Sequence, residues 1–210
     1  MTFYDFPEHL VQQAKEGGEA YWNDAGCYML INGYDFTQDS QVMDVGGYKG
    51  NFTANIIKRY NCYVRVYEPV QKYYQYCKER FKNNNKVRVH DYGLGDSESS
   101  FPIAGMDEGS SVFYPCDTGS EIVRIGDIQN EIGWDPNVNL LALNCEGGEY
   151  PILESLIKSG VIGKIKNILV QFHIFVPDAE QRRNAIREAL RKTHKEKFNY
   201  PYTWESWCVF

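Results

Sequence analysis

The sequence predicts an α/β protein, a single Rossmann-like domain with a doubly wound, mostly parallel sheet and an antiparallel C-terminal strand. Three observations lead to this expectation. Short apolar runs alternate with helical patterns, a glycine-rich turn follows the run at 41–45, and an acidic residue follows that turn after about 20 positions. Strands that are separated by helices of this length form right-handed βαβ units, which build a parallel sheet.

The elements follow in order along the chain. An amphipathic pattern predicts a first helix over 7–22, within a helical cap over 1–35 that precedes a core over 40–210. Strands are expected near 41–45, 62–67, 86–93, 139–145 and 166–172, and helices near 50–60, 69–82, 149–160 and 178–195. The residues from 203 to 210 resemble a final antiparallel strand.

Two segments depart from the alternation. Short runs lie among Gly, Ser, Asp and Pro over 97–125, which predicts a loop or small hairpin near the carboxyl edge of the sheet, where ligands bind. We expect 101–117 to help form the pocket for an acceptor substrate. The basic run from 191 to 197 is interpreted as a solvated helix end.

Composition narrows the classes of function. The 210 residues carry a net charge of −6, which argues against nucleic acid as the partner. No apolar run approaches the roughly 18 residues of a membrane span, and the charged N-terminus is unlike a signal peptide. Six cysteines without a C-x-x-C pair favour free thiols in a reducing, cytoplasmic compartment over disulfides or zinc.

The glycine-rich turn indicates the cofactor. It reads Asp44-Val45-Gly46-Gly47-Tyr48-Lys49-Gly50-Asn51, and Glu68-Pro69 ends the next strand. Glu68 can accept both hydroxyls of a ribose. Tyr48 and Asn51 stand where a dinucleotide fingerprint needs glycine, so the turn suits a ligand with an ammonium group and no pyrophosphate. S-adenosylmethionine is that ligand, and Asp44 would hold its ammonium directly or through water.

The tip of the third predicted strand completes the cofactor set. Asp91 is the candidate for the adenine amino group, with Asp96 or a turn-capping role as the alternative. The predicted cofactor-binding residues are therefore Asp44, Gly46, Gly47, Tyr48, Gly50, Asn51, Glu68, Pro69, Asp91 and Tyr92.

The fourth and fifth predicted strands end in polar side chains. Asn144 and Glu146 follow a buried apolar run, whereas Glu149 suits the first turn of a helix. His173 ends the next strand, so all three candidates, Asn144, Glu146 and His173, are expected at one sheet edge as the catalytic group. The other histidines, His9, His90 and His194, are assigned structural roles.

Several motifs, in order, resemble the FkbM-type methyltransferases. They are the 44–50 turn, Glu68-Pro69, the 109–111 loop, Ile125-Gly126-Asp127-Ile128, the block from Asn144 to Tyr150, and Gln171-Phe172-His173. The resemblance implies a class I, S-adenosylmethionine-dependent O-methyltransferase that acts on sugars or other small hydroxyl compounds. The family often has aspartate at position 144 and glutamate at 171, and their replacement here weakens a metal site.

We therefore expect methyl transfer to a sugar hydroxyl of a glycan or glycoconjugate, without a metal. His173, neutral at pH 7, is the expected base, and Glu146 orients it or serves as the base itself. Three alternatives remain at this point: Mg²⁺ held by Glu146, His173 and Asn144, a nicotinamide oxidoreductase, and a non-catalytic S-adenosylmethionine-binding module. The chain could also be one domain of a larger glycan-building protein.

Overall fold

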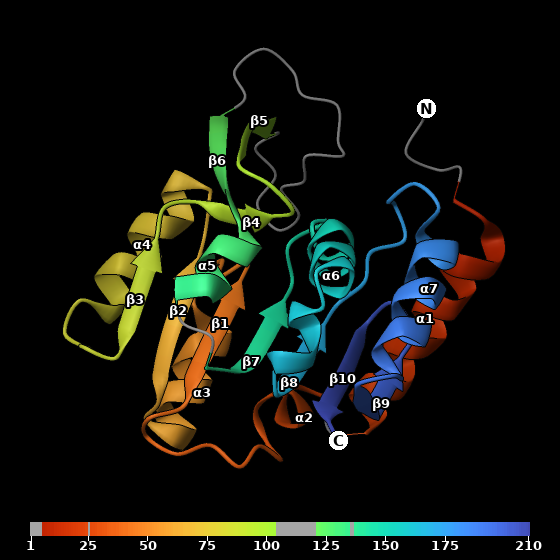
Figure 1. Cartoon of the computed structure of the whole chain (residues 1–210), viewed down its shortest axis with the longest axis horizontal. Coiled ribbons are helices and arrows are strands. Elements are labelled where there is room, and N and C mark those ends of the chain that lie inside the picture. The colour runs from red at the N-terminus through yellow and green to blue at the C-terminus, as the bar shows by residue number, and fades with distance from the viewer. Residues whose placement is uncertain (1–5, 25, 104–120, 135–136) are drawn as a thin grey trace.

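A seven-stranded sheet organises the chain, for which the computed structural model describes residues 6–24, 26–103, 121–134 and 137–210 (Figure 1). The strands lie in the order β3 (Val87–His90), β2 (Tyr63–Tyr67), β1 (Gln41–Val45), β7 (Val138–Leu143), β8 (Asn167–Val170), β10 (Trp204–Val209) and β9 (His194–Tyr200). The first five are parallel, and β10 pairs antiparallel with β8 and β9. The predicted fold class is confirmed.

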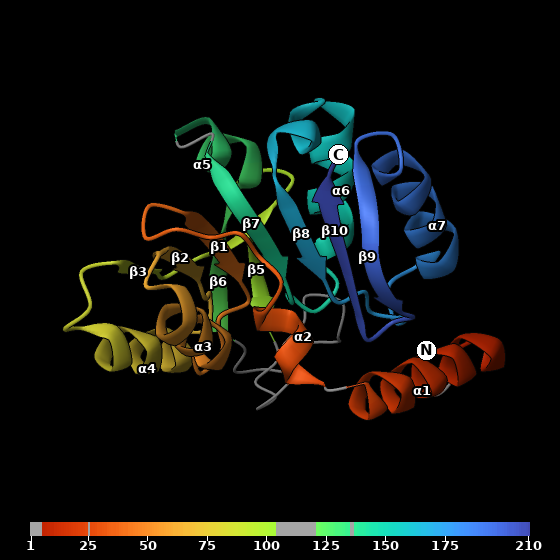
Figure 2. The ribbon, with the colours of Figure 1, turned by 90° about the horizontal axis from the view of Figure 1, so that it is seen from below.

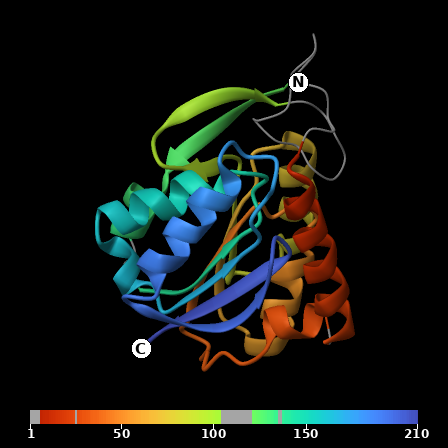
Figure 3. The ribbon, with the colours of Figure 1, turned by 90° about the vertical axis from the view of Figure 1, so that its right-hand side faces the viewer.

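Helices cover both faces of this sheet (Figures 2 and 3). They are α1 (Glu8–Asn23), α2 (Cys27–Ile31), α3 (Asn51–Tyr60), α4 (Gln71–Phe81), α5 (Ile128–Trp134), α6 (Glu149–Lys158), the 3₁₀ turn η1 (Val161–Lys164) and α7 (Ala179–Leu190). Alternate strand residues point to opposite faces. Val42 and Leu140 therefore pack in a cluster with Ile56 of α3, whereas Met43 and Leu141 pack in a second cluster with α5, α6 and α7.

The order in which successive strands are added to the sheet reverses between β1 and β7, although the two strands are parallel. From β1 the sheet grows outward through β2 and β3, and from β7 it grows the other way through β8. In such sheets the carboxyl ends of the strands on either side of this point leave a crevice where ligands bind. The fold thus brings the loops after β1 and β7 together.

Above this edge lies a second, three-stranded sheet that the sequence indicated only in part. It has the order β4 (Gly93–Gly95), β6 (Glu121–Asp127), β5 (Ser99–Ile103), and β5 and β6 pair antiparallel. The small hairpin expected over 97–125 is confirmed in its described part, whereas the loop at 109–111 and most of 101–117 lie outside the described residues. The third strand, expected over 86–93, ends at His90 because Gly93–Gly95 joins this second sheet.

The interpretation of 191–197 as a solvated helix end is wrong. Helix α7 ends at Leu190, a turn follows in which Thr193 N donates to Leu190 O (2.9 Å), and β9 begins at His194. In β9, His194 is buried and Lys195 is exposed, and charged residues of this kind protect a strand at the edge of a sheet. The Lys and Glu residues obscured the alternation in the sequence.

None of the helices in the described ranges is both long and apolar enough to cross a bilayer.

Candidate active site

The turn after β1 needs glycine because other parts of the protein pack against it. Gly46 has φ +92°, and a Cβ there would lie 1.8 Å from the carbonyl oxygen of Asn144. Gly50 has φ +70° directly before α3, and a Cβ there would lie 2.6 Å from the Phe81 ring. A side chain would be strained at both positions. The turn is therefore held against the loop after β7 on one side and against α4 on the other.

Glu68 closes the turn from the tip of β2. Its Oε2 accepts from the backbone N–H of Tyr48 (2.7 Å) and its Oε1 from that of Val70 (2.9 Å). Only 5% of Glu68 is exposed, and burial raises its pKa to about 7 despite these two hydrogen bonds. Each carboxylate oxygen can accept a further hydrogen bond, so the group can still bind hydroxyls of a ligand.

Asp44 lies beneath the turn. Its Oδ2 accepts from the Thr53 hydroxyl of α3 (2.5 Å), and burial raises its pKa to about 7. Asp44 is not among the residues that line the cavity described next. Its carboxylate thus braces the turn against the first turn of α3, and a ligand's ammonium would reach it only through an intermediary.

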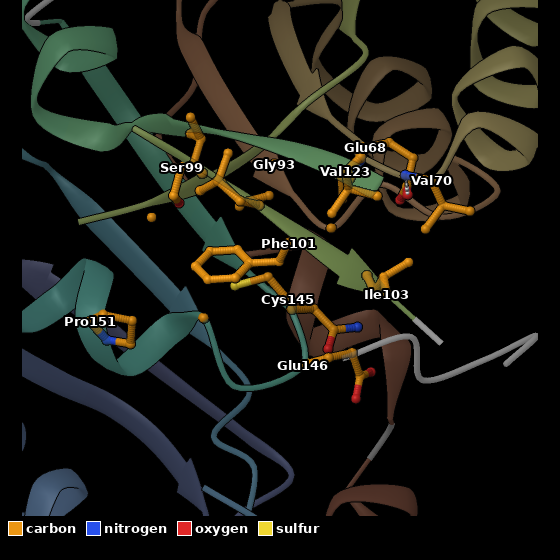
Figure 4. Close-up of a pocket in the computed structure, with 18 of the residues that line it drawn as sticks. Glu68, Val70, Gly93, Ser99, Phe101, Ile103, Val123, Cys145, Glu146 and Pro151 are labelled. Atoms are coloured by element: carbon orange, nitrogen blue, oxygen red, sulfur yellow. Dashed lines mark hydrogen bonds between the residues drawn. The ribbon is translucent and has the colours of Figure 1, made fainter. Parts of the chain in front are cut away.

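A cavity of about 720 Å³ lies between the strand tips and the second sheet. Figure 4 shows Glu68 and Glu146 at different parts of it, with Phe101, Ile103 and Val123 also on its wall. Six of the sequence-predicted site residues line it: Gly46, Tyr48, Glu68, Pro69, Asn144 and Glu146. Gly47, Gly50, Asn51, Asp91, Tyr92 and His173 lie outside its lining, as does Asp44.

The structure distinguishes between Asp91 and Asp96, the two candidates for the adenine contact. Asp91 is paired with the Arg124 guanidinium (2.5 Å), and the Tyr92 hydroxyl donates to Glu131 (2.7 Å). Asp96, the alternative for the adenine contact, lines the cavity together with Ser97. The chain turns at Gly93 into β4, and this turn carries Asp96 rather than Asp91 toward the ligand space.

The loop after β7 places a carboxylate and an amide on the cavity wall. Glu146 has φ +50°, a left-handed conformation that costs a non-glycine residue on the order of 1–3 kcal/mol. The Oδ1 atom of Asn144 is buried, and no donor in the described parts of the chain reaches it. An acceptor without a partner on a cavity wall is suited to a hydrogen bond from a ligand.

His173 lies behind this loop, between two carboxylates. Its Nδ1 is 2.9 Å from Oε1 of Glu149, and its Nε2 is 3.4 Å from Oε2 of Glu146. Burial by itself lowers the pKa of the imidazole, but the two carboxylates outweigh it and raise the pKa of His173 to about 10. The expectation of a neutral imidazole at pH 7 is therefore wrong.

Glu149 begins α6 and also binds the loop before it and His173. It is fully buried, and its oxygens accept from the N–H groups of Gly147 and His173 (both 2.9 Å) as well as from the His173 ring. Both ring nitrogens of His173 therefore face carboxylates. Within the described ranges, no three His, Cys, Asp or Glu side chains gather as metal ligands.

Sequence reasoning indicated only part of the apolar wall of the cavity: Phe101 and Ile103 belong to the segment 101–117 that was expected to line the acceptor pocket, and the other apolar residues were not assigned to it. The wall contains Val70, which directly precedes α4, Tyr73 of α4, and residues of β5 and β6, namely Phe101, Ile103, Val123 and Ile125. The alternation of 99–103 and 121–125 could have indicated them, but their partner strand is far away in the sequence. Cys145 also lines the cavity, and burial raises its pKa well above the usual range, which makes the thiol unreactive.

A doubly wound sheet with a cavity at its switch point and an acid at the tip of β2 is typical of Rossmann-like, nucleoside-binding folds. The FkbM methyltransferase domain matches residues 44–200, and the chain belongs to that family. Enzymes of this class take the methyl group from S-adenosylmethionine. No curated protein matches the sequence.

Solved structures agree with this fold. The methyltransferase FkbM of Methylobacillus flagellatus KT superposes with a TM-score of 0.58 at 16% identity, over 83% of this chain but only 44% of that protein. A putative rRNA-methylase of Clostridium thermocellum superposes with a TM-score of 0.54 at 12% identity, over 93% of this chain and 96% of that one. At these identities the likeness concerns the fold.

The residues present fit S-adenosylmethionine. A cavity of about 720 Å³ is within the usual size range of ligand sites. Glu68 offers carboxylate oxygens to a ribose, and the buried Oδ1 of Asn144 lacks a donor that a ligand could supply.

Proposed function

We propose that the protein transfers a methyl group from S-adenosylmethionine to a hydroxyl of a sugar in a glycan or glycoconjugate. One observation carries the proposal: Glu68 at the tip of β2 and the pair Asn144 and Glu146 after β7 face one cavity from either side of the Gly46 turn. The first group suits the ribose of the cofactor and the second suits an acceptor hydroxyl.

S-adenosylmethionine, when bound, supplies an electrophilic methyl group on a sulfonium. Glu68 would hold the ribose hydroxyls, and the backbone from Gly46 to Tyr48 would border the methionine part. Asp96 would border the adenine part. Since the cofactor carries the reactive group, the protein mainly aligns the two reactants.

Glu146 is the proposed base. Glu146 would accept the proton of the acceptor hydroxyl while the hydroxyl oxygen forms its bond to the methyl carbon and the sulfur departs as the leaving group. Asn144 positions the hydroxyl through Oδ1. A hydroxyl gains more from a base than an amine does, because it is the poorer nucleophile, and such help is commonly about 10²–10⁴-fold. This favours O-methylation.

A sugar suits the acceptor part of the cavity better than a nucleic acid does. Amide and carboxylate groups from Asn144, Glu146 and Gln171 can hydrogen-bond to several hydroxyls, and Phe101 offers a ring for the apolar face of a sugar. The net charge of −6 repels a polyphosphate backbone. The similarity to an rRNA-methylase concerns the fold alone. RNA is therefore included in the test below as an alternative acceptor.

A methyl-transfer screen with isotope-labelled S-adenosylmethionine tests the proposal on monosaccharide glycosides, small phenols and RNA oligonucleotides. We expect label on a sugar glycoside, with full activity in EDTA. Glu146→Gln should lower kcat by about 10²-fold or more while S-adenosylhomocysteine affinity changes by less than a factor of about three.

Other outcomes would replace the proposal. Label on RNA alone, or loss of activity in EDTA that Mg²⁺ restores, would point to a different acceptor or to metal assistance. Cofactor binding without transfer to any acceptor would favour a non-catalytic module.

A further inference from the structure

We propose that His173 is a positioning residue. Its Nδ1 is bound by Glu149, and its Nε2 holds the Glu146 carboxylate at the cavity. This inference rests on the proposed function because it concerns how the proposed base is held. The three side chains come from the loop after β7, the start of α6 and the segment after β8. The arrangement therefore ties the ends of two neighbouring strands together.

Glu149 is the fixed end of this arrangement. Its side chain is 0% exposed, and one oxygen, Oε1, accepts from both the backbone N–H and Nδ1 of His173, each at 2.9 Å. The other oxygen accepts from Gly147 N at 2.9 Å. A ring that is bound through its own backbone and its Nδ1 cannot rotate freely, and Nδ1 must carry a proton to donate.

The other ring nitrogen faces the proposed base. Nε2 of His173 is 3.4 Å from Oε2 of Glu146, and the side chains are 12% and 26% exposed. Glu146 is in a left-handed conformation, so its carboxylate is directed by a backbone that the surrounding structure must hold in place. A cationic ring at this distance attracts the carboxylate and opposes its rotation away from the cavity.

The groups that face the His173 ring favour its protonated, positively charged form. Glu146 and Glu149 are the carboxylates on its two sides, and the Tyr150 hydroxyl donates to the backbone oxygen of His173 (3.0 Å). The pKa of His173, raised to about 10, keeps the ring protonated at pH 7 to 8. His90 and His194 differ, because burial lowers the pKa of each.

The first experiment measures the protonation state of the His173 ring directly. Nitrogen NMR of ¹⁵N-histidine-labelled full chain at pH 8 should show one imidazolium with both nitrogens protonated, and that signal should be absent from His173→Gln. Glu146→Gln should lower the pH at which this signal titrates by at least one unit. A neutral His173 at pH 8 in the wild-type chain would overturn the inference.

The second experiment tests whether His173 acts through Glu146. His173→Gln should lower kcat by about tenfold or more with little change in S-adenosylhomocysteine affinity. Adding it to Glu146→Gln should change the residual single-turnover rate by less than a factor of about two, because the group that it positions is already gone. Losses that multiply in the double variant would instead show an independent role.

Matched controls separate this inference from the proposed function. His9→Gln removes an exposed histidine that pairs with Glu180 (2.9 Å), and it should leave the imidazolium signal and the rate unchanged. If the wild-type chain methylates no acceptor, the proposed function fails. The NMR measurement then still decides whether Glu149 and Glu146 hold a charged ring.

Discussion

At the scale of single residues, burial rather than residue type sets how the acids of this site behave. Asp44 and Glu68 are each 5% exposed, and burial raises the pKa of both to about 7. Glu146 and Glu149 instead face a histidine whose pKa they raise. Acids that look alike in the sequence therefore have different tasks at neutral pH.

Cofactor affinity should depend on pH through Glu68. Its ionised form is the better acceptor for ribose hydroxyls, so binding favours deprotonation, and affinity must rise as the pH passes the raised pKa. Calorimetry with S-adenosylhomocysteine should show affinity increasing by up to about tenfold from pH 6 to pH 8. Glu68→Gln should weaken binding at pH 8 by about 1.5–3 kcal/mol and flatten this dependence.

Glu79→Gln is the matched control, because Glu79 is a 73% exposed residue of α4 that pairs only at the surface with Lys82. It should leave the affinity unchanged at both pH values. Equal affinities of the wild-type and Glu68→Gln chains at pH 8 would remove the ribose assignment.

At the scale of elements, the site depends on two strand ends that approach closely. Gly46 after β1 lies against the backbone of Asn144 after β7, and Asn144 N donates to Val45 O (3.0 Å). The turn after β1 and the loop after β7 thus form one structural unit. A change in either one is expected to disturb the other.

Gly46→Ala should destabilise the fold by more than about 3 kcal/mol, because it combines a positive φ with a Cβ 1.8 Å from a backbone oxygen. Urea unfolding measures the loss. Gly133→Ala is the control in α5, where an added Cβ meets nothing within 4 Å. That change should be neutral or stabilising by up to about 1 kcal/mol. Equal effects would contradict the packing argument.

At the scale of the whole molecule, a buried ion-pair network joins α7 to the C-terminal strands. Glu205 of β10 accepts from Arg183 and Arg187 of α7 (both 2.6 Å), and all three side chains are at most 9% exposed. The network is remote in sequence from the β1 turn, but β10 pairs directly with β8, which leads to His173. It therefore supports the strand that carries the site.

Glu205→Ala should cost about 3–5 kcal/mol of unfolding free energy, because two buried guanidinium groups lose a carboxylate. Thermal and urea unfolding measure it. Glu154→Ala removes the partner of Arg182 in a bidentate pair between α6 and α7, but those side chains are 41% and 26% exposed. That pair should contribute at most about 1 kcal/mol. A small effect at Glu205 would mean that the network contributes little to stability.

Local pattern and spacing were enough for the parallel half of the fold. The strand that ends in Asp44, the turn at Gly46 and the acid at Glu68 are close in sequence, and the period of apolar residues distinguishes strands from helices. The same reasoning placed Asn144, Glu146 and His173 on neighbouring strand ends. It failed for β9, where Lys and Glu on an edge strand conceal the alternation, and for β4, which pairs with β6 over a long separation in the sequence.

By itself the sequence determined the doubly wound fold, the position of the cofactor turn and the strand ends that carry the candidate residues. Only the tertiary structure decided that Asp96 rather than Asp91 reaches the cavity, that Asp44 braces α3, and that His173 lies between two glutamates that raise its pKa. The physical reason is that strand and helix formation follow from neighbouring residues. Protonation and contact with a cavity depend instead on burial and on side chains that the fold brings together from distant positions.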